Sequence, residues 1–415
     1  MTARWVLPHS DHPLVSVLIV TFDGRQWVSR ALDALVRNTP EPYELIVVDN
    51  HSTDGTRELL RDELEGARVI ELDENIGFGR GNDRAALEAR APLLCLLNSD
   101  ALVPPGWFAT MARSFEDPRV GAVVPVYVYP DGRLQEAGAI VESDGRVVAL
   151  GVDDDPDEER WRFSRVVPYG SAACMLIRRD SFEAAGGFDP AWGRAYYEDV
   201  DLAFRLRELG QSIRLDPDVR VVHAQGASSD SVEAARILRD ANQARFRNRW
   251  AARLWHRPTM LGARHGHRFV AARDCEAVDR ILVIGGPAEA EHAHALRVAR
   301  ALAPALEQGQ VTVALPARPL DASTTNALRA TGVEALSPED WNGWLNGRIF
   351  QFSTIVADAS TRAELAELLA ATQPQAALTA VPSATMLDDT HALKKWLLDL
   401  GLVPRSVVRP RVTSR

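Results

Sequence analysis

Short apolar runs that end in polar residues, separated by helical patterns, constrain the first 100 residues more than any other feature. Val15–Thr21 is rich in β-branched residues and stops at Phe22-Asp23-Gly24, and Leu45–Val48 stops at Asp49-Asn50. The pattern predicts further strands at 68–72 and 93–97, and helices at 27–36, 52–64 and 77–90. Strands that alternate with helices in this way indicate an α/β fold with parallel strands.

The chain changes character after Pro104. Extended hairpin segments are expected over 119–151, with turns at Pro130-Asp131-Gly132 and Ser143-Asp144-Gly145. A strand at 173–177, a helix at 199–209 and extended pieces at 213–215 and 219–222 complete the first domain. The prediction is a mixed, mostly parallel sheet over residues 1–230.

A length of 415 residues predicts two or three domains. Residues 231–256 have a helical pattern and 257–275 are expected to form a linker, so 231–275 separates two domains. A second, smaller Rossmann-like α/β domain is predicted over 276–415, with strands at 280–284, 311–315 and 355–357 and helices at 288–305 and 322–331. Gly285-Gly286-Pro287 is not a dinucleotide fingerprint, because proline lacks the amide that would face a phosphate. This domain is therefore predicted to be non-catalytic, with a role in scaffolding, dimerisation or acceptor docking.

Charge is distributed unevenly along the chain. Residues 1–230 carry 24 arginines against 39 acidic residues, whereas 236–273 carry 10 arginines and one acid, Asp240. An acidic main domain argues against a nucleic-acid partner. Two hypotheses remain for the basic segment: a peripheral contact with an anionic membrane surface, or a helix that packs on the acidic domain or mediates a homo-oligomer.

The cellular location is predicted from what the sequence lacks. No apolar run approaches the roughly 18 residues of a membrane span, and three scattered cysteines do not form a disulfide framework. A signal peptide is not expected either. We therefore expect a cytoplasmic protein, with a peripheral position at the inner face of the membrane under the first hypothesis.

Polar residues at four places should converge at one edge of the predicted sheet, because ligands bind at the carboxyl ends of parallel strands. They are Asp49, Asn98-Ser99-Asp100, Glu198-Asp199 and His223. A carboxylate, an imidazole and an accepting amide suit a divalent cation that also holds diphosphate oxygens. Each residue alone has an ordinary explanation, since strand-end aspartates often cap helices and single histidines often pack in cores.

Seven ordered motifs carry a family resemblance over a little more than half of the chain: VSVLIVTFD (15–23), ELIVVDNHSTDGT (44–56), NIGFGRGND (75–83), LLCLLNSDALVPPGW (93–107), GSAACMLIRRDSFEAAGGFD (170–189), YYEDVDLAFRLRELG (196–210) and VRVVHAQGASS (219–229). Residues 14–230 resemble the inverting family-2 glycosyltransferases of GT-A fold, in particular their bacterial rhamnosyltransferase-like branch. Residues 276–415 weakly resemble the N-terminal half of a GT-B glycosyltransferase, without the nucleotide-binding second half.

The resemblance implies a role for each matching residue on the donor side. Thr21, Asp23 and Asp49 would hold the base and ribose, and the loop with Asn75 and Arg80 would lie against the nucleotide. Asn98, Ser99 and Asp100 occupy the DxD metal motif, with asparagine in its first position. His223 matches the second metal ligand, for Mg²⁺ or Mn²⁺.

The resemblance also assigns the acceptor side. Asp199 matches the general base that deprotonates the incoming hydroxyl, and attack opposite the leaving group inverts the anomeric centre. Gly170, Tyr197 and Glu198 would lie on the acceptor side, where small residues leave room and Tyr197 either stacks on a sugar or belongs to the core. Trp192 is expected in the core. Glu198 and Asp201 are expected to orient the site or cap the helix, with a surface pair of Asp201 and Arg205 as the alternative for Asp201.

These expectations together predict a metal-dependent inverting glycosyltransferase. It would transfer a sugar from a dTDP-rhamnose or UDP-hexose type donor to a saccharide or lipid-linked saccharide in cell-envelope polysaccharide or glycan assembly. A nucleotidyltransferase is disfavoured, because no triphosphate-binding loop rich in glycine and basic residues follows the first strand. The alternative is a catalytically degenerate scaffold protein that still binds a sugar nucleotide.

Overall fold

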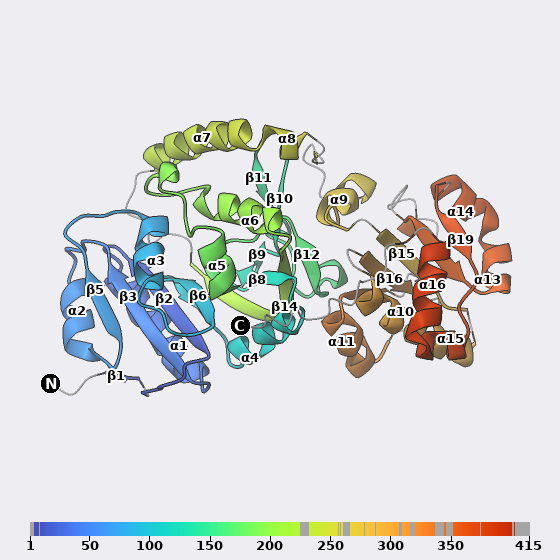
Figure 1. Ribbon diagram of the computed structural model, residues 1–415, viewed down its shortest axis with the longest axis horizontal. Coiled ribbons are helices and arrows are strands. Elements are labelled where there is room, and N and C mark those ends of the chain that lie inside the picture. The colour runs from blue at the N-terminus through green and yellow to red at the C-terminus, as the bar shows by residue number, and fades with distance from the viewer. Residues whose placement is uncertain are drawn as a thin grey trace, which may run out of the picture. The chain divides into compact units, whose positions relative to one another are not determined.

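The computed structural model of the protein separates into two compact units (Figure 1). The first contains Met1–Trp161 and Val166–Thr259, and the second contains Arg162–Arg165 and Met260–Arg415. The structure describes residues 4–7, 9–224, 232–255, 257, 259, 266–277, 279–286, 288–306, 309–315, 320–336, 344–345, 352–373, 375–400 and 402. The segment 231–275, which the sequence analysis treats as one linker region, is divided between the two units.

The first unit is built on a mixed ten-stranded sheet, as the sequence predicts for an α/β fold. Eight strands run in the order β12 (Arg165–Val167), β14 (Ser212–His223), β8 (Val120–Val128), β13 (Cys174–Arg178), β6 (Leu93–Asn98), β2 (Val15–Thr21), β3 (Tyr43–Asp49) and β5 (Arg68–Glu71). The strands β6, β2, β3 and β5 are parallel to one another. In the other half, β13 is antiparallel to both neighbours.

Short strands complete this half of the unit. β7 (Ala101–Leu102) pairs with β14, and β9 (Leu134–Glu136) pairs with β8. The predicted turn near residue 144 joins the hairpin of β10 (Ala139–Val141) and β11 (Val147–Ala149). The two extended pieces expected at 213–215 and 219–222 form one strand, β14, whose register shifts between Asp216 and Arg220. Near the N-terminus, β1 (Trp5–Val6) pairs with β4 (Leu64–Glu65).

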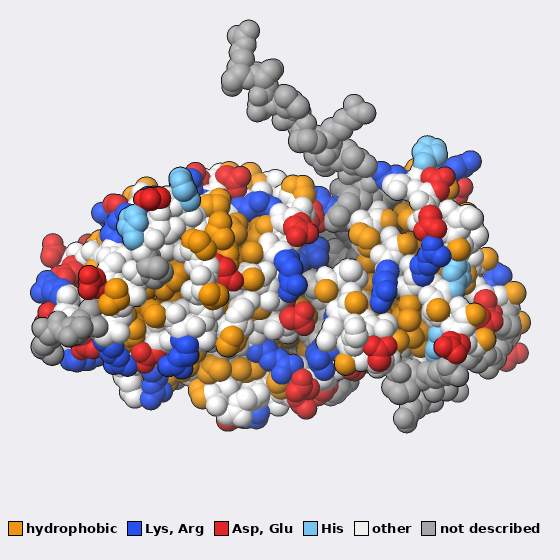
Figure 2. Space-filling view, turned by 90° about the horizontal axis from the view of Figure 1, so that it is seen from below, with side chains coloured by type: hydrophobic (Ala, Val, Ile, Leu, Met, Phe, Trp, Pro, Cys, Tyr) orange, Lys and Arg blue, Asp and Glu red, His pale blue; other side chains and the backbone are white. Residues whose placement is uncertain are grey.

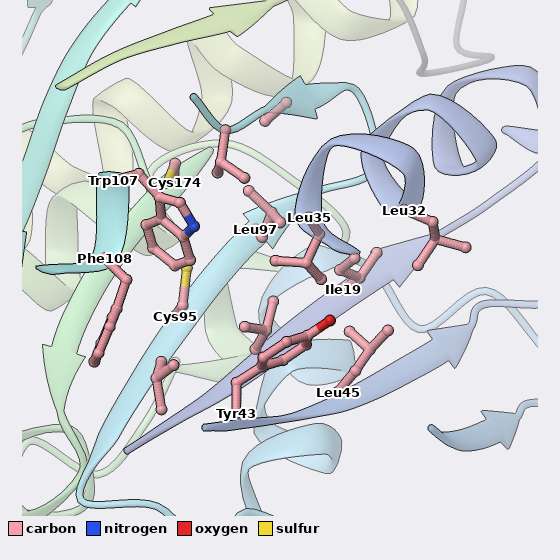
Figure 3. Close-up of a cluster of buried hydrophobic side chains, with 14 of the residues drawn as sticks. Ile19, Leu32, Leu35, Tyr43, Leu45, Cys95, Leu97, Trp107, Phe108 and Cys174 are labelled. Atoms are coloured by element: carbon pink, nitrogen blue, oxygen red, sulfur yellow. The ribbon is translucent and has the colours of Figure 1, made fainter. Parts of the chain in front are cut away.

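Helices cover both faces of the parallel strands, which explains why these strands are apolar almost throughout. On one face, Leu32 and Leu35 of α1 (Arg25–Asn38) pack with Ile19 and Leu45 in a core that also includes α2 (Thr56–Glu63) and α4 (Trp107–Ala112) (Figure 3). On the other face, α3 (Phe78–Ala86) lies close to β2, since a Cβ at Gly81 would come within 2.8 Å of Val20.

The rest of the first unit follows β13. It consists of α5 (Arg179–Ala184), α6 (Glu198–Glu208), the strand β14, α7 (Val232–Arg249) and α8 (Ala251–Leu254). On the face of the molecule shown in Figure 2, acidic and basic side chains are interspersed among uncharged ones. No helix in the described part of the chain is both long and apolar enough to cross a membrane.

The second unit has a fully parallel five-stranded sheet. Its strands run in the order β17 (Val333–Leu336), β16 (Gly309–Ala314), β15 (Asp279–Ile284), β18 (Thr354–Ala357) and β19 (Ala377–Thr379). The order 3-2-1-4-5 along the chain is that of a Rossmann-type half, with its switch point between β15 and β18. Apolar clusters pack on both faces.

The helices of this unit extend the predicted pattern. α10 (Glu289–Ala305) and α11 (Ala322–Ala330) lie where the sequence predicts them, whereas α9 (Gly266–Arg273) falls in the expected linker. The sequence analysis predicts no elements after the strand at 355–357. The structure adds the strand β19 and four helices there, α13 (Ala359–Glu364), α14 (Ala366–Thr372), α15 (Ala384–Asp388) and α16 (Thr390–Asp399).

Candidate active site

Three of the predicted polar positions meet because their strands are parallel neighbours. Thr21 at the end of β2 is paired in register with Asp49 at the end of β3, and Val20 with Asn98 at the end of β6. The carboxyl ends of these strands therefore lie side by side. The antiparallel pairing of β14 with β7 places His223 opposite Ala101, just beyond Asp100.

A carboxylate and an imidazole face each other at this edge. Asp100 Oδ1 lies 3.3 Å from His223 Nε2, and the two side chains are only 6% and 10% exposed. The amide nitrogen of Asn98 is 3.4 Å from the same Nε2, and its oxygen has no hydrogen-bond partner in the described part of the chain. One carboxylate oxygen and one ring nitrogen thus lie together, and both are donor types that Mg²⁺ or Mn²⁺ accepts, while the Asn98 side chain lies next to them with its amide nitrogen toward the ring.

The described residues contain no group of three or more His, Cys, Asp or Glu side chains that could hold a metal. A cation at Asp100 and His223 would therefore need further ligands from a bound molecule. Mg²⁺ characteristically takes one or two carboxylates together with substrate phosphates. The small donor set consequently suits a metal that arrives with a diphosphate.

The N-terminus of α6 holds the second chemical centre. Asp199 Oδ2 accepts hydrogen bonds from the Tyr169 hydroxyl at 2.5 Å and the Ala172 amide at 3.3 Å, while Oδ1 accepts from the Val200 amide at 2.9 Å. Burial raises the pKa of Asp199 above its usual range, although these hydrogen bonds lower it. The carboxylate is therefore held in a fixed orientation and has increased basicity.

Two further buried acids lie close to Asp199. Burial and the charge of Asp199 raise the pKa of Glu198 to about 8, and one of its oxygens has no partner among the described residues. Burial raises the pKa of Glu136 to about 7, while its Oε1 accepts a hydrogen bond from the Ser171 amide at 2.9 Å. Glu136 accepts from Ser171, whose neighbour Ala172 donates to Asp199, and the residue before Glu136, Gln135, contacts His223, so these contacts join the two centres.

Sequence reasoning misses Tyr169 and Glu136. Tyr169 directly precedes the glycine of the 170–189 motif, so its position beside that motif was the available indication. Glu136 lies in a hairpin segment that the sequence marks only as extended. Its importance comes from a tertiary contact with Ser171, which no local pattern records.

Buried oxygens without partners also mark the ends of β2 and β3. Thr21 Oγ1 and Asp49 Oδ1 have no hydrogen-bond partner in the described residues. The other oxygen of Asp49 accepts from Arg57 Nε at 2.7 Å and from the Ser52 amide at 3.2 Å. Asp23 has a positive φ of 46° and accepts from the Thr53 amide at 2.6 Å, so it fixes the adjacent loop. The contact of Arg57 with Asp49 is another that the sequence analysis misses.

The loop that contains Asn75 is anchored to the end of β3. Asn75 Oδ1 accepts from Asn50 Nδ2 at 2.9 Å and from the Gly77 amide at 3.0 Å, which indicates that Asn75 shapes the loop. Glycine is required at 77, because its φ is 88° and a Cβ would lie 2.5 Å from the carbonyl oxygen of Arg194. The side chain of Arg80 is exposed.

Two residues expected on the acceptor side have packing roles instead. A Cβ at Gly170 would lie 2.5 Å from Val124, so packing against β8, rather than room for a ligand, accounts for this glycine. Tyr197 is 6% exposed, packs on Trp192 and Phe246, and donates its hydroxyl hydrogen to the Gly145 carbonyl. The structure thus favours the core interpretation of Tyr197, as the sequence does for Trp192.

The comparison with protein families agrees with the residue pattern. Residues 16–186 match the model of Glycosyl transferase family 2. This part of the chain is a family-2 glycosyltransferase domain. The match ends before Asp199 and His223, so the inclusion of these two residues in the candidate site rests on the sequence motifs and on the geometry.

Curated relatives of this glycosyltransferase align with a little over half of the chain. An uncharacterised protein of Sinorhizobium fredii is 29% identical over 60% of this chain and 28% of its own length. The O-antigen biosynthesis protein RfbC of Myxococcus xanthus is 28% identical over 53% of this chain and 18% of its own length. An N-acetylglucosaminyl-diphospho-decaprenol L-rhamnosyltransferase of Mycobacterium tuberculosis is 28% identical over 54% of this chain and 80% of its own length. The chain thus spans less than a third of the first two proteins.

Solved structures give more distant likenesses. GalNAc-T7 with UDP, GalNAc and Mn²⁺ has a TM-score of 0.46 at 18% identity, over 58% of this chain and 48% of that one. The mannosyltransferase PcManGT of Pyrobaculum calidifontis with GDP-Man and Mn²⁺ has a TM-score of 0.43 at 22% identity, over 60% and 67%.

The helix α7 supports the loop before the catalytic helix of the glycosyltransferase unit. The amide nitrogen of Asn242 lies 2.9–3.0 Å from the carbonyl oxygens of Trp192, Ala195 and Tyr196. This contact stabilises an unusual turn, because Tyr196 and Tyr197 both have positive φ values, 71° and 75°. Left-handed backbone at two successive non-glycine residues is strained and persists only where the surroundings hold it.

Two arginines of the basic segment form ion pairs within this same unit. Arg249 pairs with Asp189 at 2.5 Å, and Arg253 with Glu208 at 2.6 Å. Asp201, which the surface-pair alternative would expose, is fully buried and accepts from Arg205 Nε and Trp250 Nε1, both at 2.8 Å. The surface-pair alternative is therefore wrong, because α7 and α8 cover this side of α6.

Proposed function

We propose that the protein is a metal-dependent, inverting glycosyltransferase that uses a nucleotide-diphosphate sugar. The observation that carries the proposal is that the oriented carboxylate of Asp199 and the Asp100–His223 pair are joined by the contacts of the adjacent residues Gln135 and Glu136. Asp199 is fixed by Tyr169 and has a raised pKa, as a general base requires. Asp100 and His223 can hold a cation beside the leaving group.

On the donor side, the strand-end oxygens supply contacts for the nucleotide. The unpaired oxygen of Asp49 can accept from the imide N–H of uracil or thymine, and Thr21 and Asp23 lie beside it for the ribose. Ser99 borders the same edge, and the exposed Arg80 can approach the phosphates. The donor is therefore of the UDP-hexose or dTDP-rhamnose type, and the likeness to a rhamnosyltransferase supports the latter.

The residues of the chain then divide the chemistry. A Mg²⁺ or Mn²⁺ ion held by Asp100 and His223 would supply neutralisation of the charge that develops on the diphosphate. Asp199 accepts the proton of the acceptor hydroxyl, while Tyr169 and the Ala172 amide keep its oxygen oriented. Because the hydroxyl attacks opposite the diphosphate, the anomeric configuration inverts. Glu198, with a pKa of about 8, remains protonated near neutrality and leaves the charge on Asp199.

The acceptor is proposed to be a saccharide or lipid-linked saccharide of cell-envelope polysaccharide assembly. The named relatives, an O-antigen protein and a rhamnosyltransferase of a decaprenol-linked sugar, support this class. A cytoplasmic enzyme at the inner membrane face would meet such a lipid. Trp255, which is 77% exposed, is the residue best placed for that contact. Liposome flotation tests it, and no binding to anionic vesicles at low salt contradicts it.

A thermal-shift panel tests the proposed function. Wild type, Asp100→Ala and the exposed control Asp73→Ala are melted with UDP, dTDP, GDP or CDP, each with and without Mn²⁺. About 100 Kd of the correct nucleotide should add roughly 2.7 kcal/mol of stability. A Mn²⁺-dependent shift that Asp100→Ala alone loses supports the enzyme. Absence of any shift contradicts nucleotide binding and therefore the proposed enzyme, and a scaffold that binds a sugar nucleotide fails with it.

A further inference from the structure

The strand β9 contains a bulge next to the metal side of the site. Leu134 pairs with Val128 and Glu136 with Tyr127, so Gln135 is an extra residue with no partner on β8. Bulges of this kind re-aim side chains and are frequent beside active sites. Here the consecutive residues Gln135 and Glu136 both contact the site, the first at His223 and the second at Ser171.

Gln135 makes two hydrogen bonds to the same histidine and is only 4% exposed. Its Nε2 donates to the backbone carbonyl of His223 at 2.9 Å, and its Oε1 lies 2.8 Å from the ring Nδ1. A carbonyl oxygen can only accept, so the amide nitrogen must face it. The amide oxygen must then face Nδ1, which requires the ring proton to be on Nδ1.

In the neutral ring this assignment leaves a lone pair on Nε2, the nitrogen that faces the other site residues. Asp100 Oδ1 lies 3.3 Å from Nε2, and the Asn98 amide nitrogen lies 3.4 Å from it on the donor side. Without Gln135, the proton could move to Nε2 and be donated to Asp100. Such a hydrogen bond would occupy the two atoms that a cation needs.

We infer that Gln135 is a positioning residue that fixes the Nδ1–H tautomer of His223 and so keeps Nε2 available to a divalent cation. The inference rests on the metal site of the proposed function. Partners of this kind orient metal-binding histidines, and their loss costs about 10–100-fold in metal affinity or activity. Gln135 was not a candidate in the sequence, because its role depends on a bulge and on a strand 88 residues away.

The test compares Gln135→Met, which removes both hydrogen bonds, with Gln135→Glu, which keeps an acceptor for Nδ1. Gln310→Met is the matched control, since Gln310 is also buried and donates to a backbone carbonyl, that of Gly332. The tautomer is read in the metal-free full chain from the ¹⁵N shifts of histidine-labelled protein, with His223 assigned by its absence in His223→Ala. Mn²⁺ affinity is measured by electron paramagnetic resonance at saturating UDP or dTDP.

We expect Nδ1–H in wild type, in Gln135→Glu and in Gln310→Met, and a substantial Nε2–H population in Gln135→Met. Mn²⁺ affinity should fall about 10–100-fold in Gln135→Met alone. An unchanged tautomer in Gln135→Met, or Nε2–H in wild type or in a folded Gln135→Glu, overturns the inference. If wild type binds no Mn²⁺ with any nucleotide, the proposed metal site fails, whereas the metal-free spectra still test the tautomer separately.

Discussion

Polar residues stand at the ends of β2, β3 and β6 in the first unit and directly after β18 in the second, but their side chains make different contacts. In the first unit, the ends of β2, β3 and β6 leave Thr21 Oγ1, Asp49 Oδ1 and Asn98 Oδ1 without partners among the described residues. In the second unit, Asp358 at the end of β18 caps α13 with both oxygens on Thr361, at 2.9 and 2.7 Å. The same strand-end position thus leaves an oxygen open in one unit and caps a helix in the other.

Buried charge shows the same contrast. Arg273 is fully buried in the second unit and pairs with Asp274 at 2.7 Å and with Glu334 at 3.1 Å. In the first unit, Glu136, Glu198 and Asp199 are buried acids with raised pKa values. Among the described residues, no arginine or lysine forms an ion pair with any of the three. Fold alone therefore does not distinguish the two sheets, whereas the buried acids at and near the N-terminus of α6 mark the first unit as the one with the candidate site.

Asp199→Asn should produce the largest effect on the catalytic side of this comparison. The amide keeps the shape and an acceptor for Tyr169 but cannot take a proton, so turnover should fall by about 10²–10⁴-fold. Nucleotide-dependent thermal shifts should remain, and release of nucleoside diphosphate measures the turnover. The exposed control Asp180→Asn should be as active as wild type. Turnover near the wild-type rate in Asp199→Asn would remove Asp199 as the base.

Arg273→Met breaks the paired network of the second unit. It leaves Asp274 and Glu334 buried without their cation, which typically costs about 3–5 kcal/mol. Calorimetry should show this loss, while nucleotide binding by the remaining folded protein is retained. The control is Arg297→Met, which removes the exposed pair with Asp388 and should cost at most about 1 kcal/mol. Equal effects of the two variants would contradict a structural role for the buried network.

Glu198→Gln tests whether the buried Glu198 carboxylate lowers the free energy of unfolding of the protein. The folded pKa of about 8 lies above that of the unfolded chain, so wild type loses stability as pH rises from about 4.5 to 8. The variant should therefore be the more stable protein at pH 8, by about 1.4 kcal/mol for each unit of pKa difference. Below pH 4.5 the difference should vanish. Melting curves at pH 4, 6 and 8 measure the stability of Glu198→Gln relative to wild type, with the exposed Glu74→Gln as control. A stability difference that does not grow with pH would contradict the raised pKa of Glu198.

Asn242→Leu should have the smallest effect of the four. It frees the carbonyls of Trp192, Ala195 and Tyr196, so the turn before Asp199 should populate other conformations. We expect a decrease of about tenfold in kcat, corresponding to about 1.4 kcal/mol, with little change in nucleotide affinity. The neighbouring Gln243→Leu is the control, because the hydrogen bond from the Gln243 amide to the Asp144 carbonyl is exposed and, at 3.5 Å, long. Identical kinetics for both variants would show that the turn does not need Asn242.

Sequence patterns predict the parallel half of the first sheet and the edge at which Asp49, Asn98 and Asp100 lie. Period and turn residues are local properties, and parallel strands bring their carboxyl ends together without further information. The same reasoning predicts the second α/β unit from the apolar runs at 280–284, 311–315 and 355–357 and the helical patterns between them.

The contacts that hold the site residues could not be predicted in this way. Tyr169 on Asp199, Gln135 on His223 and Arg57 on Asp49 depend on register, a bulge and helix placement. The burial of Asp201 could not be predicted for the same reason, since an i,i+4 pair has the same sequence pattern whether or not another helix covers it.

The support of the catalytic turn by α7 has a consequence for how the enzyme is made. A ribosome synthesises Thr21, Asp49 and Asp100 early, and the parallel strands that carry them can pair as soon as they emerge. Asp199 emerges before Asn242, so the nascent protein has its base before it has the residue that holds the strained tyrosines. Nucleotide binding should consequently mature during translation ahead of sugar transfer. A chain released after residue 230 would be expected to bind its donor and turn it over poorly.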